Sequence, residues 1–179
     1  MRARVTASGI AAVLVLTGSN VSGQTADPMT EGASRQMRLV QSYILRTANK
    51  VPEELYGFRP TSEVRTLGQI LGHVADDVLG FCTQATGEEP PTATIEQSVT
   101  GKAPLIAALT DSFAFCDQVL SSMSDRTGAE LVPFRLGPSP RLSIVYFSAA
   151  HAYEHYGNLV TYMRIQGIVP PSSERRTPG

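Results

Sequence analysis

Four stretches of the chain repeat inward-facing residues every three or four positions, and this spacing constrains the fold more than any other feature. The stretches cover residues 34–50, 66–86, 102–123 and 140–166. Their inward positions are Met37, Val40, Ile44 and Ala48; Leu67, Ile70, Leu71, Val74, Val78 and Phe81; Leu105, Leu109, Phe113, Cys116, Leu120 and Met123; and Ile144, Phe147, His151, His155, Leu159 and Tyr162. Such a repeat predicts four amphipathic helices, each with one face to bury.

Residues that favour helix ends flank these stretches. Thr66 and Gln69 have the spacing of a capping box, and Gly87 is suited to stop the helix that they begin. Ser139 is expected to be the N-cap of the last helix, with Pro140 at its first position.

Four amphipathic helices can bury their stripes only against one another, which predicts an all-α fold, a four-helix bundle. The sequence shows no alternation of strands and helices of the kind that builds a parallel sheet. The second and third helices are joined by polar residues 88–101. A connection of this length can cross back along the bundle and allow these two helices to run parallel.

The amino-terminal segment has the three-part pattern of a secretory signal peptide. Arg2 and Arg4 give a positive start, residues 5–16 are mostly apolar, and small polar residues lead to a cleavage site after Gly23. The apolar run is shorter than the ~20 residues that span a bilayer. A disordered tail or a short anchor is the alternative.

We therefore expect an exported protein, periplasmic or extracellular. The expected organisation is a signal peptide at 1–23, a flexible linker at 24–32, the helical bundle at 33–171 and a disordered tail at 172–179.

Charge and composition exclude several classes of function. The chain carries 15 Lys and Arg against 16 Asp and Glu and has no Trp. It therefore offers neither a basic field nor an aromatic platform to nucleic acid. Two cysteines are too few for a disulfide framework or an all-cysteine zinc site. We expect no nucleic-acid partner and, after signal removal, no membrane partner.

All three histidines lie on the predicted helices. His151 and His155 are one turn apart on the inward face of the last helix, and His73 lies at the edge of the stripe on the second. Imidazoles buried without partners cost on the order of one to several kcal/mol each. A divalent metal would satisfy one nitrogen of each, and three His with water form an open, catalytic type of site. Histidines that simply pack in the core are the alternative.

The spacing of this pair differs from the zinc-protease motif. That motif places a Glu directly after the first His, where this chain has Ala152. Glu154 is expected to point away from the site. Peptide hydrolysis by that mechanism is therefore not expected.

Two carboxylates on the second helix lie within one turn of His73. Asp77 and Asp76 could orient an imidazole, accept a proton from bound water or add a ligand, and Asp77 is the candidate catalytic residue. A solvated helix carboxylate is the alternative for each. Further polar candidates, for which packing or a favourable helix-end charge is the alternative, are Tyr153, Tyr156, Tyr162 and Arg164.

The two cysteines test the direction of the second and third helices. Cys82 lies 16 residues beyond Thr66, and Cys116 lies 14 residues beyond Lys102. At ~1.5 Å per residue the two sulfurs reach nearly the same height if the helices run parallel. Whether they form a disulfide or remain two separate buried thiols is left open.

The chain resembles the DinB-like superfamily of DNA-damage-inducible proteins over nearly all of residues 37–171. The segments that carry the resemblance are Phe58–Pro60, Arg65–His73, His151–Asn158, Tyr162–Arg164 and Gly167–Pro171. The resemblance implies an up-down-down-up bundle and a divalent metal held by His73, His151 and His155. Many relatives have Gln where Asn158 stands, and some are thiol-dependent transferases or isomerases.

Three hypotheses for the function follow, from different classes. The first is an exported metal-dependent enzyme, thiol-transferase-like or hydrolase-like, whose small-molecule substrate the sequence does not identify. The second is a metal-binding or structural bundle without turnover, and a weaker third is an interaction protein with core histidines. Zn is the default metal, with Ni or Fe as alternatives, since imidazole suits them all. A homodimer through an outer helix face is left open.

Overall fold

The fold is described here from a computed structural model, in which residues 26–92 and 94–174 are placed well enough to describe. The elements in chain order are α1 (Pro28–Lys50), η1 (Glu53–Leu55), α2 (Leu67–Thr86), α3 (Ile95–Ser98), α4 (Lys102–Ser121), α5 (Asp125–Gly128), β1 (Leu131–Val132), β2 (Ser139–Pro140), α6 (Arg141–Ile165) and η2 (Pro171–Ser173). The expected signal peptide at 1–23 lies outside the described residues.

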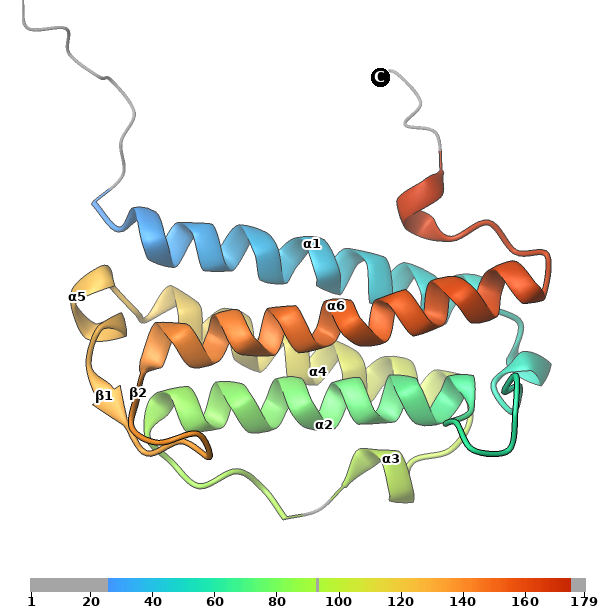
Figure 1. Cartoon of the computed structure of the whole chain (residues 1–179), viewed down its shortest axis with the longest axis horizontal. Helices are drawn as coiled ribbons and strands as arrows, with labels where there is room; N and C mark the ends of the chain where they lie inside the picture. Colours follow the sequence, from blue (N-terminus) through green and yellow to red (C-terminus); the bar gives the residue numbers. More distant parts are fainter. Residues whose placement is uncertain (1–25, 93, 175–179) are drawn as a thin grey trace, which may run out of the picture.

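Four long helices, α1, α2, α4 and α6, pack side by side (Figure 1). Helices α1 and α6 run in one direction, and α2 and α4 run in the other. Helix α2 packs against α4 and α6, and α1 packs against the same two. The all-α, up-down-down-up fold is therefore confirmed, with the long α2–α4 connection that parallel neighbours require.

The predicted stripes form the core, apart from Met123, Phe147 and His151, which are only partly buried. Helix α1 buries Met37, Val40, Ile44 and Ala48 completely. Helix α4 is long and apolar enough to span a membrane by length and composition. Its Leu109, Phe113 and Cys116 are nevertheless fully buried in the bundle, because α4 packs against both α1 and α2.

The start of α2 agrees with the prediction made from the sequence, whereas the start of α6 does not. Thr66 accepts a hydrogen bond from the Gln69 backbone N–H, and the Gln69 side chain accepts one from the Thr66 N–H, which completes the capping box. Ser139 is not an N-cap. It pairs in a short antiparallel ladder with Val132, and Pro140 precedes the first turn of α6 without a side-chain cap.

Helix α1 begins at Pro28, six residues before the expected start at Ser34. The Asp125 carboxylate accepts hydrogen bonds from the backbone N–H groups of Met29 and Thr30, at 3.1 and 2.8 Å. This acceptor lies on α5, far away in sequence, so the local pattern gave no sign of it. Residues 28–32 therefore belong to the bundle and not to a flexible linker.

The expected disordered tail is ordered in its first residues. Ser172 and Ser173 lie in η2, and Glu174 forms ion pairs with Arg46 and Lys50 of α1. These contacts join the end of the chain to the bundle. Residues 175–179 lie outside the described part of the chain.

Cys82 of α2 and Cys116 of α4 form a disulfide, with their Cα atoms 5.3 Å apart. The two sulfurs can meet because α2 and α4 run parallel (Figure 1). Both cysteines also lie at a similar distance from the start of their helices. Both side chains are fully buried, so the bridge crosses the core.

Reduction of this disulfide is expected to destabilise the fold. The bridge closes a loop of 34 residues in sequence separation, for which the loss of chain entropy in the unfolded state corresponds to about 3–4 kcal/mol. Urea unfolding should show a lower midpoint for the wild type with dithiothreitol than without it. The Cys82→Ala/Cys116→Ala double variant, as the control, should not respond to dithiothreitol. Two free thiols in the untreated wild type would contradict the bridge.

Candidate metal centre

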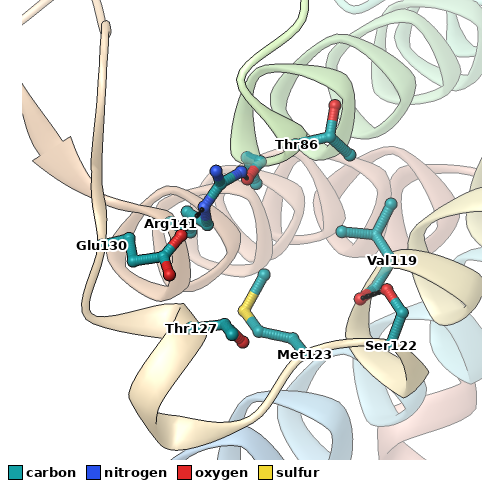
Figure 2. A pocket seen from close by; sticks show the side chains of 8 residues that line it. Thr86, Val119, Ser122, Met123, Thr127, Glu130 and Arg141 are labelled. Atoms are coloured by element: carbon teal, nitrogen blue, oxygen red, sulfur yellow. Dashed lines mark hydrogen bonds and ion pairs between the residues drawn. The ribbon is translucent and has the colours of Figure 1, made fainter.

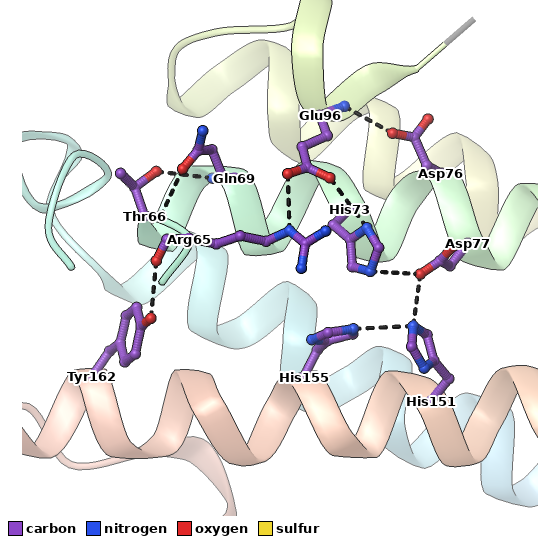
Figure 3. A network of polar contacts seen from close by, with 10 residues as sticks. All are labelled: Arg65, Thr66, Gln69, His73, Asp76, Asp77, Glu96, His151, His155 and Tyr162. Carbon is purple, nitrogen blue, oxygen red and sulfur yellow. Dashed lines mark hydrogen bonds and ion pairs between the residues drawn. The ribbon is translucent and has the colours of Figure 1, made fainter. Parts of the chain in front are cut away.

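The three histidines meet between α2 and α6 (Figure 3). The ring centroid of His73 lies 5.6 Å from that of His151 and 4.6 Å from that of His155. His155 is 6% exposed, and the side chains of His73 and His151 are about one-fifth exposed. The two helices therefore bring together the imidazoles that the sequence placed on separate segments.

Asp77 completes the cluster from the same helix as His73. Its Oδ2 atom lies 2.9 Å from His73 Nε2 and 2.7 Å from His151 Nε2. One donor atom from each of these four residues lies within 4.8 Å of the others. Metal–ligand distances of about 2.0–2.2 Å place the donor atoms of one ion ~3–4 Å apart. The four side chains thus need only small rotations to share an ion.

The proton arrangement in the cluster leaves a free lone pair. If His73 and His151 donate their Nε2 protons to Asp77, His151 Nε2 has no second proton to give to His155 Nε2, which lies 3.0 Å away. Two protonated nitrogens would repel at this distance, so a neutral His155 carries its proton on Nδ1 and keeps a lone pair on Nε2. The Nδ1 atom of His155 is buried and has no hydrogen-bond partner among the described residues. His155 therefore presents a basic nitrogen to the centre, as a metal ligand must.

The pKa values follow from these contacts. The hydrogen bond with Asp77 raises the pKa of His73 above its ordinary value, although burial opposes it. Burial would raise the pKa of Asp77, but its hydrogen bonds and charge interactions with His73 and His151 hold it below the ordinary value. Burial, together with the neighbouring imidazoles, lowers the pKa of His155 to about 4. His155 is consequently neutral at neutral pH and ready to coordinate.

Carboxylates also contact the outer nitrogens of two histidines. Glu96 Oε2 lies 3.1 Å from His73 Nδ1, and Glu96 Oε1 is paired with Arg65 Nε at 2.9 Å. Glu154 Oε2 lies 3.5 Å from His151 Nδ1, the nitrogen that faces away from Asp77, so Glu154 stays outside the donor cluster, as expected. A carboxylate on the far nitrogen fixes the orientation of a ligand histidine and makes it more basic.

The connection between α2 and α4 supplies Glu96. Asp76 accepts hydrogen bonds from the backbone N–H groups of Ile95 and Glu96, at 2.6 and 2.8 Å, and so holds the start of α3. A Cβ atom at Gly72 would lie 2.8 Å from the Glu96 Cα. Helix α3 can approach α2 this closely only because position 72 has no side chain.

The other polar candidates have structural partners, apart from Tyr153, which packs partly buried against the core. Tyr162 donates a hydrogen bond to the Arg65 carbonyl, Tyr156 accepts one from the Ser172 N–H, and Arg164 donates one to Ser173. Asp76, as shown, holds α3. The sequence did not indicate Glu96 or Arg65, because the single-turn α3 and the loop before α2 are too short for periodicity to show which residue faces the site.

Cavities adjoin the cluster on two sides. One of about 270 Å³ is lined by Asp77, Asp76 and residues of the α2–α4 connection. Another, of about 360 Å³, is lined by His155, Asn158 and Arg65. A further cavity lies at the opposite end of α2, where Arg141 is paired with Glu130 (Figure 2). That third cavity has no histidine in its lining and no contact with the cluster.

The close approach at Gly72 predicts opposite effects of alanine at two positions of the same helix. Gly72→Ala should lower the unfolding free energy by about 1–2 kcal/mol, since backbone must move to admit the Cβ. Gly80→Ala should be neutral or stabilising by up to about 1 kcal/mol, because its Cβ would meet only ordinary contact, 3.8 Å from Pro90. Urea unfolding of both variants measures this. Equal stability of the two would contradict the packing described here.

Comparisons with known proteins place this chain in a family. Residues 36–159 match the DinB superfamily. A search of curated proteins found no match. Among solved structures, a DinB-like protein from Bacillus cereus ATCC 10987 is similar over 79% of this chain and 95% of its own, with 18% identity and a TM-score of 0.67. A member of the DinB family from Exiguobacterium sibiricum 255-15 is similar over 81% and 95%, with 20% identity and a TM-score of 0.60.

A mycothiol-dependent maleylpyruvate isomerase is also similar, over 73% of this chain, with 20% identity and a TM-score of 0.62. The chain spans 60% of the length of that isomerase. At these identities the solved structures establish the fold alone. The match over residues 36–159 establishes that the chain belongs to the DinB superfamily.

Proposed function

We propose that this protein is an exported, metal-dependent enzyme that binds a divalent ion through His73, His151 and His155. The observation that carries the proposal is the convergence of three Nε2 atoms and one carboxylate oxygen from two helices. Asp77 serves as a fourth ligand or as the acceptor for the proton of a bound water. Zn is the default ion, with Ni and Fe as alternatives for such a donor set.

Catalysis, as opposed to storage of the ion, is supported by the cavities beside the cluster. Asp77 borders one and His155 borders the other, so small molecules could reach the centre from two sides. When bound, a divalent ion would lower the pKa of a coordinated water or thiol and polarise an electrophile. Two access routes suit transfer between two substrates, and a thiol-dependent transfer or isomerisation agrees with the isomerase of similar fold. Hydrolysis is the second candidate reaction.

Export is supported by the sequence of residues 1–23 and by the Cys82–Cys116 disulfide, since buried structural disulfides form in oxidising compartments. We further propose that the partner is a small molecule and that the mature protein acts without nucleic acid or membrane. A homodimer stays a proposal, with no described contact to support it.

Metal content tests the first part of the proposal. Elemental analysis of protein purified without an affinity tag should find about one divalent ion per chain, and each of the variants H73A, H151A and H155A should bind it at least about 100-fold more weakly. Asp111→Asn, on the exposed side of α4, is the control and should bind normally. Affinity should fall as pH decreases, because protons compete for the imidazoles and the pKa of His73 is raised. Unchanged metal content in H151A would contradict the site.

An open coordination position separates the enzyme from the non-catalytic alternative. Azide added to the Co²⁺-substituted protein should change the visible absorption spectrum, because a catalytic site keeps one position for water or substrate. The Asp77→Asn variant should also bind azide, because the amide keeps the shape of the carboxylate. A spectrum indifferent to azide in the wild type would indicate a closed site and favour a metal-binding bundle without turnover.

A further inference from the structure

The cavity beside Asp77 has one cationic side chain in its lining, the exposed Arg135. Its volume is about 270 Å³, and its lining includes Asp77, Phe81, Gln84 and Arg135. Arg135 lies in the loop between β1 and β2, and Phe81 lies on α2 one turn beyond Asp77. A loop and a helix that are far apart in sequence thus close one cavity around opposite charges.

Arg135 is held by three aromatic rings. Its guanidinium carbon lies 4.8 Å from the ring centroid of Phe147, 5.2 Å from that of Phe81 and 5.9 Å from that of Phe134. These rings also pack edge to face on one another. Cation–π contacts of this kind fix the plane of a guanidinium without using its N–H groups.

The N–H groups of Arg135 are consequently available to a ligand. Within residues 26–92 and 94–174, no carboxylate forms an ion pair with Arg135. The two acids of the cavity are engaged elsewhere, Asp76 with the backbone of α3 and Asp77 with the imidazoles. An arginine that is positioned and unpaired in a cavity is suited to bind a planar oxyanion with two parallel hydrogen bonds.

The same rings connect Arg135 to the candidate metal centre. Phe147 stacks on His151, with ring centroids 6.2 Å apart, and Phe81 meets His151 edge to face at 5.9 Å. Arg135 therefore lies one aromatic layer away from a metal-binding histidine. A ligand held by Arg135 would extend along this layer toward Asp77.

We propose that this cavity binds a carboxylate group of the substrate, with Arg135 as the residue that recognises it. The substrate class is a small carboxylic acid whose reacting group reaches the His73–Asp77–His151–His155 cluster. This assignment deepens the proposed function and rests on it for the role of the metal. Recognition of the carboxylate by Arg135 is a separate property that can be measured without turnover.

Calorimetric titration with succinate tests the assignment on the full chain, loaded with metal and dialysed free of excess ion. Arg135→Gln should weaken succinate binding at least tenfold. Arg135→Lys keeps the charge but loses the planar guanidinium, so its affinity for succinate should lie between those of the wild type and Arg135→Gln. Succinamide, which has the same length without charge, should bind equally to the wild type and Arg135→Gln. Arg126→Gln, an exposed arginine on α5, is the matched control and should bind succinate as the wild type does.

The outcomes separate this assignment from the metal proposal. Equal succinate affinity in the wild type and Arg135→Gln, or no binding to the wild type at millimolar concentration, would overturn the carboxylate site. The titration is repeated on protein stripped with chelator, where a difference between the two proteins supports recognition by Arg135 independently of metal. Absence of metal from the purified wild type would overturn the proposed function alone.

Discussion

The bundle is organised around one carboxylate that is shared by imidazoles from two helices. Asp77 of α2 contacts His73 on its own helix and His151 across the interface. Burying an ionisable group between helices costs free energy unless the group has a partner. The raised pKa of His73 and the lowered pKa of Asp77 indicate that each group stabilises the charged form of the other. The contact can form only when α2 and α6 lie at one relative height, so the polar cluster also specifies how the apolar stripes pair.

The topology of the bundle and the chemistry of its centre depend on the same connection. Parallel α2 and α4 require a long crossover, and this crossover carries α3 past the outer side of α2. Gly72 allows the approach, Asp76 holds the first residues of α3, and Glu96 thereby reaches His73. A segment needed only to return the chain to the other end of the bundle has become the outer support of His73. The Cys82–Cys116 bridge ties the same two helices together further along α2.

The sequence predicted those features that depend on residues close together in the chain. The apolar spacing predicted the four helices, and the capping box at Thr66 predicted where α2 begins. The i, i+4 pair His151 and His155 needed only one helix, and the resemblance to DinB-like proteins placed His73 with them. The wrong start predicted for α1 has another cause: the helix begins early because of Asp125, some 95 residues away. No local pattern encodes an acceptor supplied by a distant turn.

The same reasoning explains why Glu96 and Arg135 could not be found from spacing. Glu96 lies in the single-turn helix α3 and Arg135 lies in the loop between β1 and β2. Both segments are too short to show a period, and both residues acquire their positions from packing against the long helices. Arg135 depends on rings from α2 and α6 as well as its own loop. Helices of a bundle supply a rigid set of ligands, whereas the connections supply charges whose placement can vary without disturbing the core. In the proposed function, the helices would therefore hold the ion, and Arg135, carried by a loop, would recognise the substrate without altering that centre.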